Sequence, residues 1–424
     1  MDQERCGDAF NSLVQVQMNQ KIQLVVIGAG LIGPRHAQHV HERPDCELFA
    51  IIDHSAKGPG VASQFNTLLF RSVDEMLDFC DERGLRVPDG AIVATPNHTH
   101  VPIGSKLAAR GIHMLMEKPL APTVADCKAL IAQCRYSGVH LLVGHHRRFN
   151  PYIISAKQNM DKVGRPVAIQ GTWALKKPDT YFSEKPWRSS IELGGGTMLI
   201  NLIHDIDLLQ YLLGPVVKVY SELLIKQRAG NHSENAVDEG AVLTLRFANG
   251  CCGTFVCADN VISPYSFESG TGENPTVPHS ENAAGFYRLF GSDGTLSIPD
   301  FTLHHQNNLP YEKRHWLNPV SSEKLDLSYQ SLQDFDGGGA QMNYGLPTPS
   351  ASPNDKDSPI HHIGQKQPVP FELQLEHFAN LITGRESEVK CTGEDAMRAL
   401  LCVDAILESS RTGMPQYVPD IDLR

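Results

Sequence analysis

Residues 22–33 read IQLVVIGAGLIG, and this stretch decides the fold of the first third of the chain. The run 22–27 is almost entirely apolar, which is typical of a strand buried on both faces of a parallel sheet. Gly28, Gly30 and Gly33 follow with the spacing G-x-G-x-x-G. Here the first glycine permits a tight turn, the second lets the backbone approach a pyrophosphate, and the third permits close helix packing. The stretch predicts a strand, a dinucleotide-binding turn that includes Leu31 and Ile32, and a helix.

The next expected strand, residues 48–52, is followed by Asp53. An acidic side chain at this offset from the glycines can bind the adenosine ribose hydroxyls, and it would repel a 2′-phosphate. This favours NAD as the cofactor. Lys57 and Arg71 leave NADP open, because a nearby cation can hold the phosphate. The plain alternative for Asp53 is a turn residue after a strand.

Strands and helices continue to alternate as far as residue 143. The expected strands are 91–94, 112–116 and 139–143. A capping box at Ser72–Glu75 opens a short helix, and the other expected helices are 100–110 and 123–137, the last ended by Gly138. Such alternation indicates βαβ units in a doubly wound parallel sheet. We therefore predict a polar tail over residues 1–20 and a Rossmann domain over residues 21–146.

The pattern changes after residue 146, where hairpins replace the βαβ units. Asn249-Gly250 lies between two alternating runs and is a strong hairpin signal. The remaining expected elements are strands 167–173, 241–247, 252–257, 286–290 and 295–298, and helices 197–213, 371–383 and one from 392 to about 413. We predict a second, α+β domain over residues 147–424 with an antiparallel sheet. Residues 300–370 are rich in Pro, Ser, Asn, Asp and Gly and are expected to form a long, partly mobile loop insertion.

Composition narrows the class of protein. The formal net charge of −11 over 424 residues argues against a nucleic-acid partner. The chain has no apolar run long enough to span a membrane, and its start lacks the features of a signal peptide. Ten cysteines occur without a C-x-x-C pair, so reduced thiols are expected rather than disulfides or a metal site. These features predict a cytoplasmic protein.

The end of the expected strand 91–94 carries polar side chains. Thr95, Pro96, Asn97 and His98 follow the strand 91–94, at the edge where open α/β sheets bind ligands. Turn chemistry alone would also explain the Pro and Asn. These four residues are predicted to contact the cofactor.

Glu117-Lys118-Pro119 follows the strand 112–116. Because Pro119 favours an extended backbone at Lys118, the ammonium should point into the cleft, where it can stabilise a developing alkoxide. Glu117 can orient the lysine or meet the cofactor, and both Glu117 and Lys118 are expected among the cofactor contacts. The alternative is a solvated surface lysine.

His204 is the second candidate for the chemistry. It lies within the expected helix 197–213, three residues after Asn201 and downstream of Gly194-Gly195-Gly196. A histidine titrates near neutrality, so it can accept a hydroxyl proton while hydride departs. The alternative is a helix histidine satisfied by its neighbours.

The order of these motifs resembles that of the Gfo/Idh/MocA oxidoreductases. The motifs are Gly28–Gly33 with His36, Thr95-Pro96-Asn97, Glu117-Lys118-Pro119, GHHRRF at 144–149, Trp187-Arg188, and Gly194-Gly195-Gly196 with His204. The resemblance implies a nicotinamide cofactor, NAD or NADP, and a C-terminal domain with a large open sheet. It also implies a homodimer or homotetramer that acts on a small sugar, polyol or related hydroxy compound such as a hydroxy acid.

The resemblance also implies roles for individual residues. Lys118 corresponds to the family's catalytic lysine and His204 to its proton-transferring histidine. Arg147, Trp173 and Arg188 are expected to line the substrate pocket with Lys118, Asn201 and His204. No metal ligand is predicted.

The sequence departs from the family pattern at one position. Many members carry an aspartate four residues before the histidine, where this chain has Ile200. Isoleucine cannot hold a substrate hydroxyl, so Asn201 is expected to orient the substrate, and a variant substrate class rather than inositol is predicted. The predicted function is an NAD(P)-dependent oxidoreductase. The alternatives are a glycosidase that uses transient oxidation by bound NAD, and a non-catalytic NAD-binding regulator.

Overall fold

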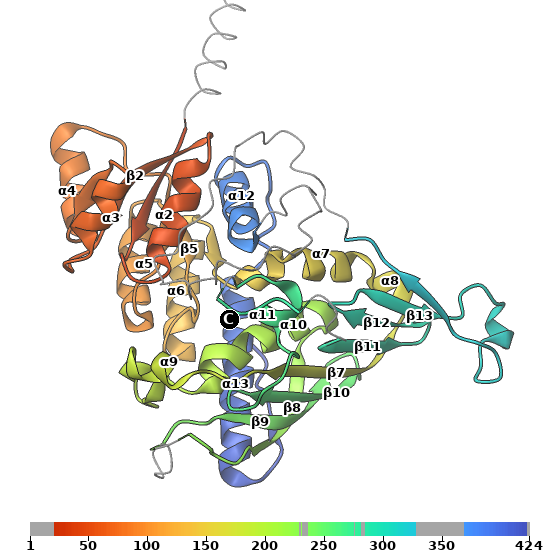
Figure 1. Ribbon diagram of the computed structural model, residues 1–424. Helices are drawn as coiled ribbons and strands as arrows, with labels where there is room; N and C mark the ends of the chain where they lie inside the picture. Colours follow the sequence, from red (N-terminus) through yellow and green to blue (C-terminus); the bar gives the residue numbers. More distant parts are fainter. Residues whose placement is uncertain are drawn as a thin grey trace, which may run out of the picture.

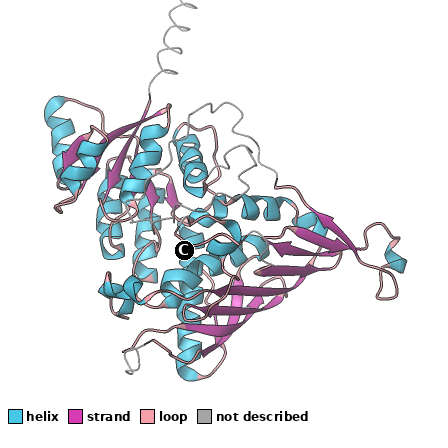
Figure 2. Cartoon of the chain, viewed as in Figure 1, coloured by secondary structure: helices cyan, strands magenta, loops and turns pink. Residues whose placement is uncertain are grey.

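The computed structural model describes residues 21–228, 230, 236–274, 276–280, 285–327 and 369–421. The predicted tail 1–20 and most of the predicted insertion lie outside these residues. Within them the chain forms two sheets, one in the first third and one in the remainder (Figures 1 and 2). No helix in this part of the chain has the length and hydropathy that a membrane crossing needs.

The first sheet has six strands, in the order β3-β2-β1-β4-β5-β6. The strands are β1 Ile22–Ile27, β2 Cys46–Ile52, β3 Leu68–Phe70, β4 Gly90–Val93, β5 His113–Met116 and β6 Leu141–Val143. Every neighbouring pair is parallel. This is the doubly wound Rossmann order, in which the topological switch lies between β1 and β4. The predicted fold class is confirmed for this half.

Helices fill the connections of this sheet: α2 Gly33–Glu42, α3 Gly58–Gln64, α4 Val73–Arg83, η1 Asn97–Thr99, α5 His100–Ala109 and α6 Val124–Ser137. The predicted cap of α4 is present, because the Ser72 hydroxyl accepts a hydrogen bond from the Glu75 N–H. Helix α4 ends at Gly84 with φ 61°, a left-handed conformation that favours glycine. Helix α3 and strand β3 are additions that the sequence analysis did not predict.

The second sheet has nine strands, in the order β14-β13-β12-β11-β7-β10-β9-β8-β15. The strands are β7 Pro166–Ala174, β8 Val216–Leu223, β9 Gly240–Phe247, β10 Cys252–Ala258, β11 Tyr287–Gly291, β12 Gly294–Ile298, β13 Thr302–His305, β14 Ser321–Lys324 and β15 Gln416–Tyr417. Only β7 and β10 pair in parallel; the other pairs are antiparallel. The expected large, mainly antiparallel sheet is therefore confirmed.

The structure corrects the prediction that residues 300–370 form only a loop insertion, because the start of this segment forms two strands. Strands β13 and β14 lie inside residues 300–370 and extend the sheet beyond β12. Leu303 of β13 and the neighbouring Phe301 are buried in the second core, so apolar burial holds this segment in place despite its polar composition. Residues 328–368 are outside the described part of the chain.

Helices cover one face of the second sheet. The elements of this region are η2 His146–Phe149, α7 Pro151–Gln158, α8 Met160–Val163, α9 Asp179–Ser183, η3 Pro186–Ser189, the π-helical turn η4 Met198–Leu202, α10 Ile203–Leu213, α11 Phe267–Thr271, η5 Tyr311–Lys313, α12 Pro370–Ile382 and α13 Gly393–Thr412. Residues of α10 and α13 share a hydrophobic core with the inward residues of β9 and β10. Outward residues such as Val242, Thr244 and Arg246 are exposed, so the described residues leave the other face of the sheet open.

The last two helices return to the first sheet. Leu375 and Phe378 of α12 and Met397 of α13 belong to the core around β1, whereas Val403 and Ile406 of α13 belong to the second core. In Figure 1, α12 lies between the parallel sheet and α7. The end of the chain thus packs against both halves, and this packing fixes how they meet.

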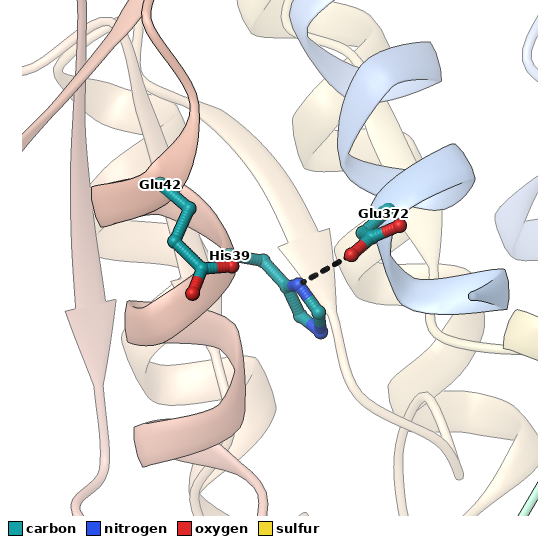
Figure 3. A group of neighbouring side chains, drawn as sticks. All are labelled: His39, Glu42 and Glu372. Carbon is teal, nitrogen blue, oxygen red and sulfur yellow. Dashed lines mark ion pairs between the residues drawn. The ribbon is translucent and has the colours of Figure 1, made fainter. Parts of the chain in front are cut away.

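One polar cluster marks the contact between α2 and α12. Figure 3 shows His39 and Glu42 of α2 facing Glu372 of α12, with His39 Nδ1 3.8 Å from a Glu372 oxygen. Ligand atoms of the three residues lie within 4.8 Å of one another. Both carboxylates already accept hydrogen bonds, Glu42 from Gln38 and Glu372 from the Val369 N–H. We interpret the cluster as a helix contact and assign no metal to it.

Candidate active site

The glycine turn after β1 has the shape that a dinucleotide needs. Gly28 has φ 104°, and a Cβ at this residue would lie 2.6 Å from the Ala94 carbonyl oxygen. A Cβ at Gly33 would lie 1.8 Å from the Gly28 oxygen. By contrast, no atom of the described chain lies within 4 Å of the Cβ position of Gly30. The first and third glycines are required by packing, while Gly30 borders open space at the start of α2, where a pyrophosphate can approach the backbone.

Leu31 and Ile32 complete this turn. The Leu31 side chain is exposed and Ile32 is partly buried. Both positions lie beside the free N–H groups at the start of α2, which begins at Gly33. Their predicted role in cofactor binding fits this location.

Asp53 lies beside the glycine turn and is joined to it. One carboxylate oxygen accepts a hydrogen bond from the Ala29 N–H at 2.6 Å, and the other from the Ser55 N–H at 2.7 Å. Burial raises the pKa of Asp53, but the hydrogen bonds from Ser55 and Ala29 outweigh it and hold the pKa below its ordinary value. The carboxylate is therefore ionised and fixed in place, as an acceptor for ribose hydroxyls must be. The residues of the turn and Asp53 fit a bound NAD.

A buried histidine joins the loops after β4 and β5. His100 Nε2 lies 2.9 Å from the Thr95 carbonyl oxygen, and His100 Nδ1 lies 3.0 Å from the Pro119 carbonyl oxygen. Around it, Thr95 and Asn97 are partly buried, while Pro96 and His98 are exposed. His100 was not predicted as a site residue, since a histidine in the first turn of a helix carries no distinctive signal.

Glu117 faces the helix that follows the glycine turn. Its Oε1 lies 2.8 Å from Nε2 of the buried His36 in α2. Burial raises the pKa of Glu117, but the hydrogen bond and charge of His36 outweigh it, so the pKa lies below its ordinary value. Glu117 thus anchors the Lys118 loop to the cofactor-binding helix, and the Lys118–Pro119 peptide bond is cis.

Lys118 reaches across to the second half of the chain. Its Nζ donates a hydrogen bond to the Ile200 carbonyl oxygen at 3.1 Å. Burial lowers the pKa of Lys118 to about 8; the Glu117 charge opposes this effect, and the Arg147 and Lys177 charges add to it. Lys118 therefore loses its proton far more easily than a surface lysine does.

The Ile200 carbonyl lies in an irregular helical turn. The predicted helix 197–213 is present, but its first turn, Met198–Leu202, is π-helical. Asp238 caps this turn, because one of its oxygens accepts from the Thr197 and Met198 N–H groups at 3.0 and 3.1 Å. π-Turns inside helices often occur at functional sites. Here the turn presents the Ile200 carbonyl to Lys118.

His204 follows four residues later and is buried. Its ring centre lies 5.9 Å from that of His145 and 5.5 Å from that of His146. Burial is the largest cause that holds the pKa of His204 well below its ordinary value, and the Lys118 charge is the next. The imidazole is therefore neutral at pH 7 and can accept a proton. The hydrogen bond from Lys118 to the Ile200 carbonyl brings the lysine to the helical turn that directly precedes His204.

Asn201 is held by a residue that the sequence analysis missed. Its Oδ1 accepts a hydrogen bond from Lys177 Nζ at 2.6 Å. Lys177 follows strand β7, its side chain is 7% exposed, and it forms an ion pair with Asp259 at 3.3 Å. The pair Lys176-Lys177 resembles a solvated surface segment in the sequence, so no local signal marked Lys177.

Two predicted substrate residues lie in a buried charge cluster. Arg147 pairs with Glu268 and, at 2.9 Å, with Glu273, while its Nη1 lies 3.7 Å from Asp205. Trp173 is fully buried and donates its indole N–H to Glu268 at 2.8 Å. These contacts use the Trp173 N–H and two of the three Arg147 nitrogens, while Arg147 Nη1 has no hydrogen-bond partner among the described residues. Their role as substrate contacts remains a prediction.

Arg188 lies in η3 and is partly buried. Its guanidinium centre lies 3.6 Å from the centre of the Tyr181 ring, and Nη1 donates to the Tyr181 carbonyl oxygen at 2.6 Å. The backbone here is tight, because a Cβ at Gly195 would lie 2.6 Å from the Arg188 carbonyl oxygen. Arg188 thus lies beside the glycine-rich segment that leads into the π-turn.

The fold, the glycine turn and Asp53 define a class of protein: a dinucleotide-binding protein in which a lysine of the first half contacts the helical turn that precedes a buried histidine. Residues 22–145 match the profile of the Gfo/Idh/MocA oxidoreductase family's NAD-binding Rossmann fold, and residues 157–419 match that of its C-terminal alpha/beta domain. The chain belongs to this oxidoreductase family. The predicted family, NAD cofactor and enzyme class are confirmed.

Similar proteins agree with this assignment. The chain is 28% identical over 298 residues to the scyllo-inositol 2-dehydrogenase (NAD(+)) of Bacillus subtilis, covering 68% of this chain and 77% of that protein. It is 24% identical over 397 residues to an uncharacterized oxidoreductase of Streptococcus pneumoniae, covering 91% and 95%. The WlbA dehydrogenase of Bordetella pertussis, solved with NADH and UDP-GlcNAcA, has the same fold at a TM-score of 0.65 and 20% identity, covering 95% of this chain and 100% of that one.

Proposed function

We propose that this protein is an NAD-dependent dehydrogenase or reductase that acts at a hydroxyl or carbonyl carbon of a sugar, a polyol or a related hydroxy compound. The observation that carries the proposal is the hydrogen bond from Lys118 to the Ile200 carbonyl, which brings the lysine of the first half to the turn that precedes His204. The names of relatives such as scyllo-inositol 2-dehydrogenase and myo-inositol 2-dehydrogenase support the substrate class.

The residues divide the work as follows. Bound NAD supplies the hydride chemistry. Lys118, as a cation, polarises the substrate oxygen and stabilises the charge that develops on it. Neutral His204 accepts the hydroxyl proton during oxidation and returns it during reduction. Asn201 positions the substrate, since Ile200 offers only its backbone.

The test is a panel of sugars, sugar acids, polyols and hydroxy acids, each mixed with the protein and NAD⁺ while NADH formation is followed. NADH formation that needs both Lys118 and His204 supports the proposal. Tightly retained NAD without NADH from any substrate would favour the regulator, and cleavage of a glycoside without net NADH would favour the glycosidase. Either result would overturn the proposal.

The pKa of Lys118 predicts the pH dependence of this reaction. A lysine with a lowered pKa loses its charge as the pH rises through about 8 instead of through about 10.4. Because the cation polarises the substrate, kcat/KM for oxidation should fall above about pH 8. The measurement is kcat/KM across a pH series, and Lys118→Arg should move the fall to higher pH. A rate that stays level up to about pH 10 in the unmodified protein would contradict a role for the lysine charge.

The assembly and location of the protein are also part of the proposal. The open face of the nine-stranded sheet carries exposed apolar side chains, among them Val242, Val256 and Phe290, which suit a contact between copies in a homodimer or homotetramer. The nine described cysteines are free thiols, as in a reducing compartment such as the cytoplasm. We also propose the domain limits 21–146 and 147–424, and a preference for NAD over NADP because of Asp53.

A further inference from the structure

Lys177 is held beside Asn201, the residue proposed to position the substrate, and contacts its side-chain amide. Its ammonium lies 2.6 Å from Asn201 Oδ1 and 3.3 Å from an Asp259 oxygen. Asp259 is itself shared with Arg228, which donates to its other oxygen at 2.8 Å. The ring of Tyr181 lies 4.7 Å from the ammonium. The lysine is thus fixed from several sides and has little freedom to turn away.

The chemistry of lysine decides the orientation of the Asn201 amide. An ammonium group only donates hydrogen bonds, so the amide must turn its oxygen, not its nitrogen, toward Lys177. The two N–H donors of Nδ2 then point to the other side. No described residue accepts a hydrogen bond from them, and Asn201 is only partly buried. Asn201 therefore has donors available for a substrate.

The orientation of the Asn201 amide matters for the proposed reaction because of where Asn201 lies in the helix. The preceding residue, Ile200, accepts the hydrogen bond from Lys118, and His204 follows on the same helix. Asn201 thus follows the residue whose carbonyl binds Lys118 and precedes His204 by three residues. A free amide could present either its oxygen or its nitrogen, whereas a fixed one always presents the nitrogen.

We propose that Lys177 is a positioning residue that locks the Asn201 amide with Nδ2 toward the substrate, so that Asn201 donates a hydrogen bond to a substrate oxygen. This inference rests on the proposed function, because it assigns a role within the same site. It adds a residue, Lys177, and a direction of hydrogen bonding to the substrate contacts predicted from the sequence.

The test is a double-mutant cycle measured with the best substrate of the panel. Lys177→Met alone should lower kcat/KM by about 10- to 100-fold, mainly through KM, since it removes a hydrogen bond to a charged group. In an Asn201→Ala background the same change should cost less than about 3-fold, because Lys177 acts through Asn201. Lys177→Arg, which keeps the charge, should recover part of the activity. Lys176→Met replaces the exposed neighbour and is the matched control.

Two results would overturn the proposal. One is an equal loss from Lys177→Met with and without Asn201, which would indicate a general structural role. The other is an unchanged kcat/KM in Lys177→Met, measured with a substrate whose turnover is stopped by Lys118→Ala. A failure of the proposed function would give a different result, because turnover would then persist in Lys118→Ala.

A second measurement needs no substrate. In the NAD-bound protein labelled with ¹⁵N-asparagine, the side-chain amide signal of Asn201 is identified by its absence in Asn201→Ala. Lys177→Met should shift this signal and Lys176→Met should not. An unmoved signal in Lys177→Met would overturn the proposal.

Discussion

Replacement of Lys118 by alanine should lower kcat by about 100- to 1,000-fold and leave the affinity for NAD nearly unchanged. The ammonium is the only group of the Glu117-Lys118-Pro119 segment assigned to the substrate oxygen, and alanine removes it completely. Most of the cofactor contacts are assigned to other residues, among them the glycine turn and Asp53. The measurements are initial rates of NADH formation at saturating substrate and calorimetric titration with NAD⁺.

Lys128→Ala is the matched control for this change. Lys128 is an exposed lysine of α6 in the same half of the chain, so its removal should change neither turnover nor NAD affinity. If Lys118→Ala retains full turnover, Lys118 has no part in the mechanism. A large loss of NAD affinity would place the residue in cofactor binding instead.

The sequence predicted those parts of the fold whose signals are local. The strand at 22–27, the glycine turn and the caps of α4 and α6 each depend on residues that are adjacent in the chain, and all are present. Strand β3 has only three residues, too few to show a period. Strands β13 and β14 lie in a segment of polar composition, and they form because β12 offers an edge that no local pattern reveals.

In the candidate site, too, only residues with a local sequence signal could be singled out. Lys118 and His204 could be predicted because each lies at a marked place, a strand end and a helix after glycines. The roles of His36, His100 and Lys177 could not, because their partners are distant in sequence: His36 meets Glu117, and Lys177 meets Asn201 and Asp259. Arg147 and Trp173 share the partner Glu268, which lies in a segment without a recognisable sequence pattern.

Helix α12 packs beside the candidate site, and no sequence motif predicted this contact. Phe371, in the first turn of α12, lies against His36 and His146, with ring centres 5.1 and 4.5 Å apart. His36 holds Glu117, and His146 lies beside His204. A helix more than 160 residues away in sequence from His204 thus borders groups on both sides of the candidate site.

The largest loss of stability is expected from Arg148→Met. Arg148 donates to both oxygens of Asp207 at 2.8 and 2.6 Å, and it also pairs with Asp395 of α13 at 3.1 Å. The Asp207 side chain is 1% exposed, so the substitution leaves a buried carboxylate without its main cation. Breaking such a pair costs about 3–5 kcal/mol. Thermal unfolding of the NAD-free protein, followed by circular dichroism, should show a markedly lower midpoint.

Arg135→Met is the matched control, because Arg135 pairs with the residue next to Asp395. Its ion pair with Glu394 also reaches the first turn of α13, but the Arg135 side chain is 59% exposed. An exposed pair contributes about 0–1 kcal/mol, so this variant should unfold close to the unmodified protein. Adding Asp207→Leu to Arg148→Met should restore part of the loss, since it removes the stranded charge. Equal destabilisation by Arg148→Met and Arg135→Met would show that burial of Asp207 is not what makes Arg148 important.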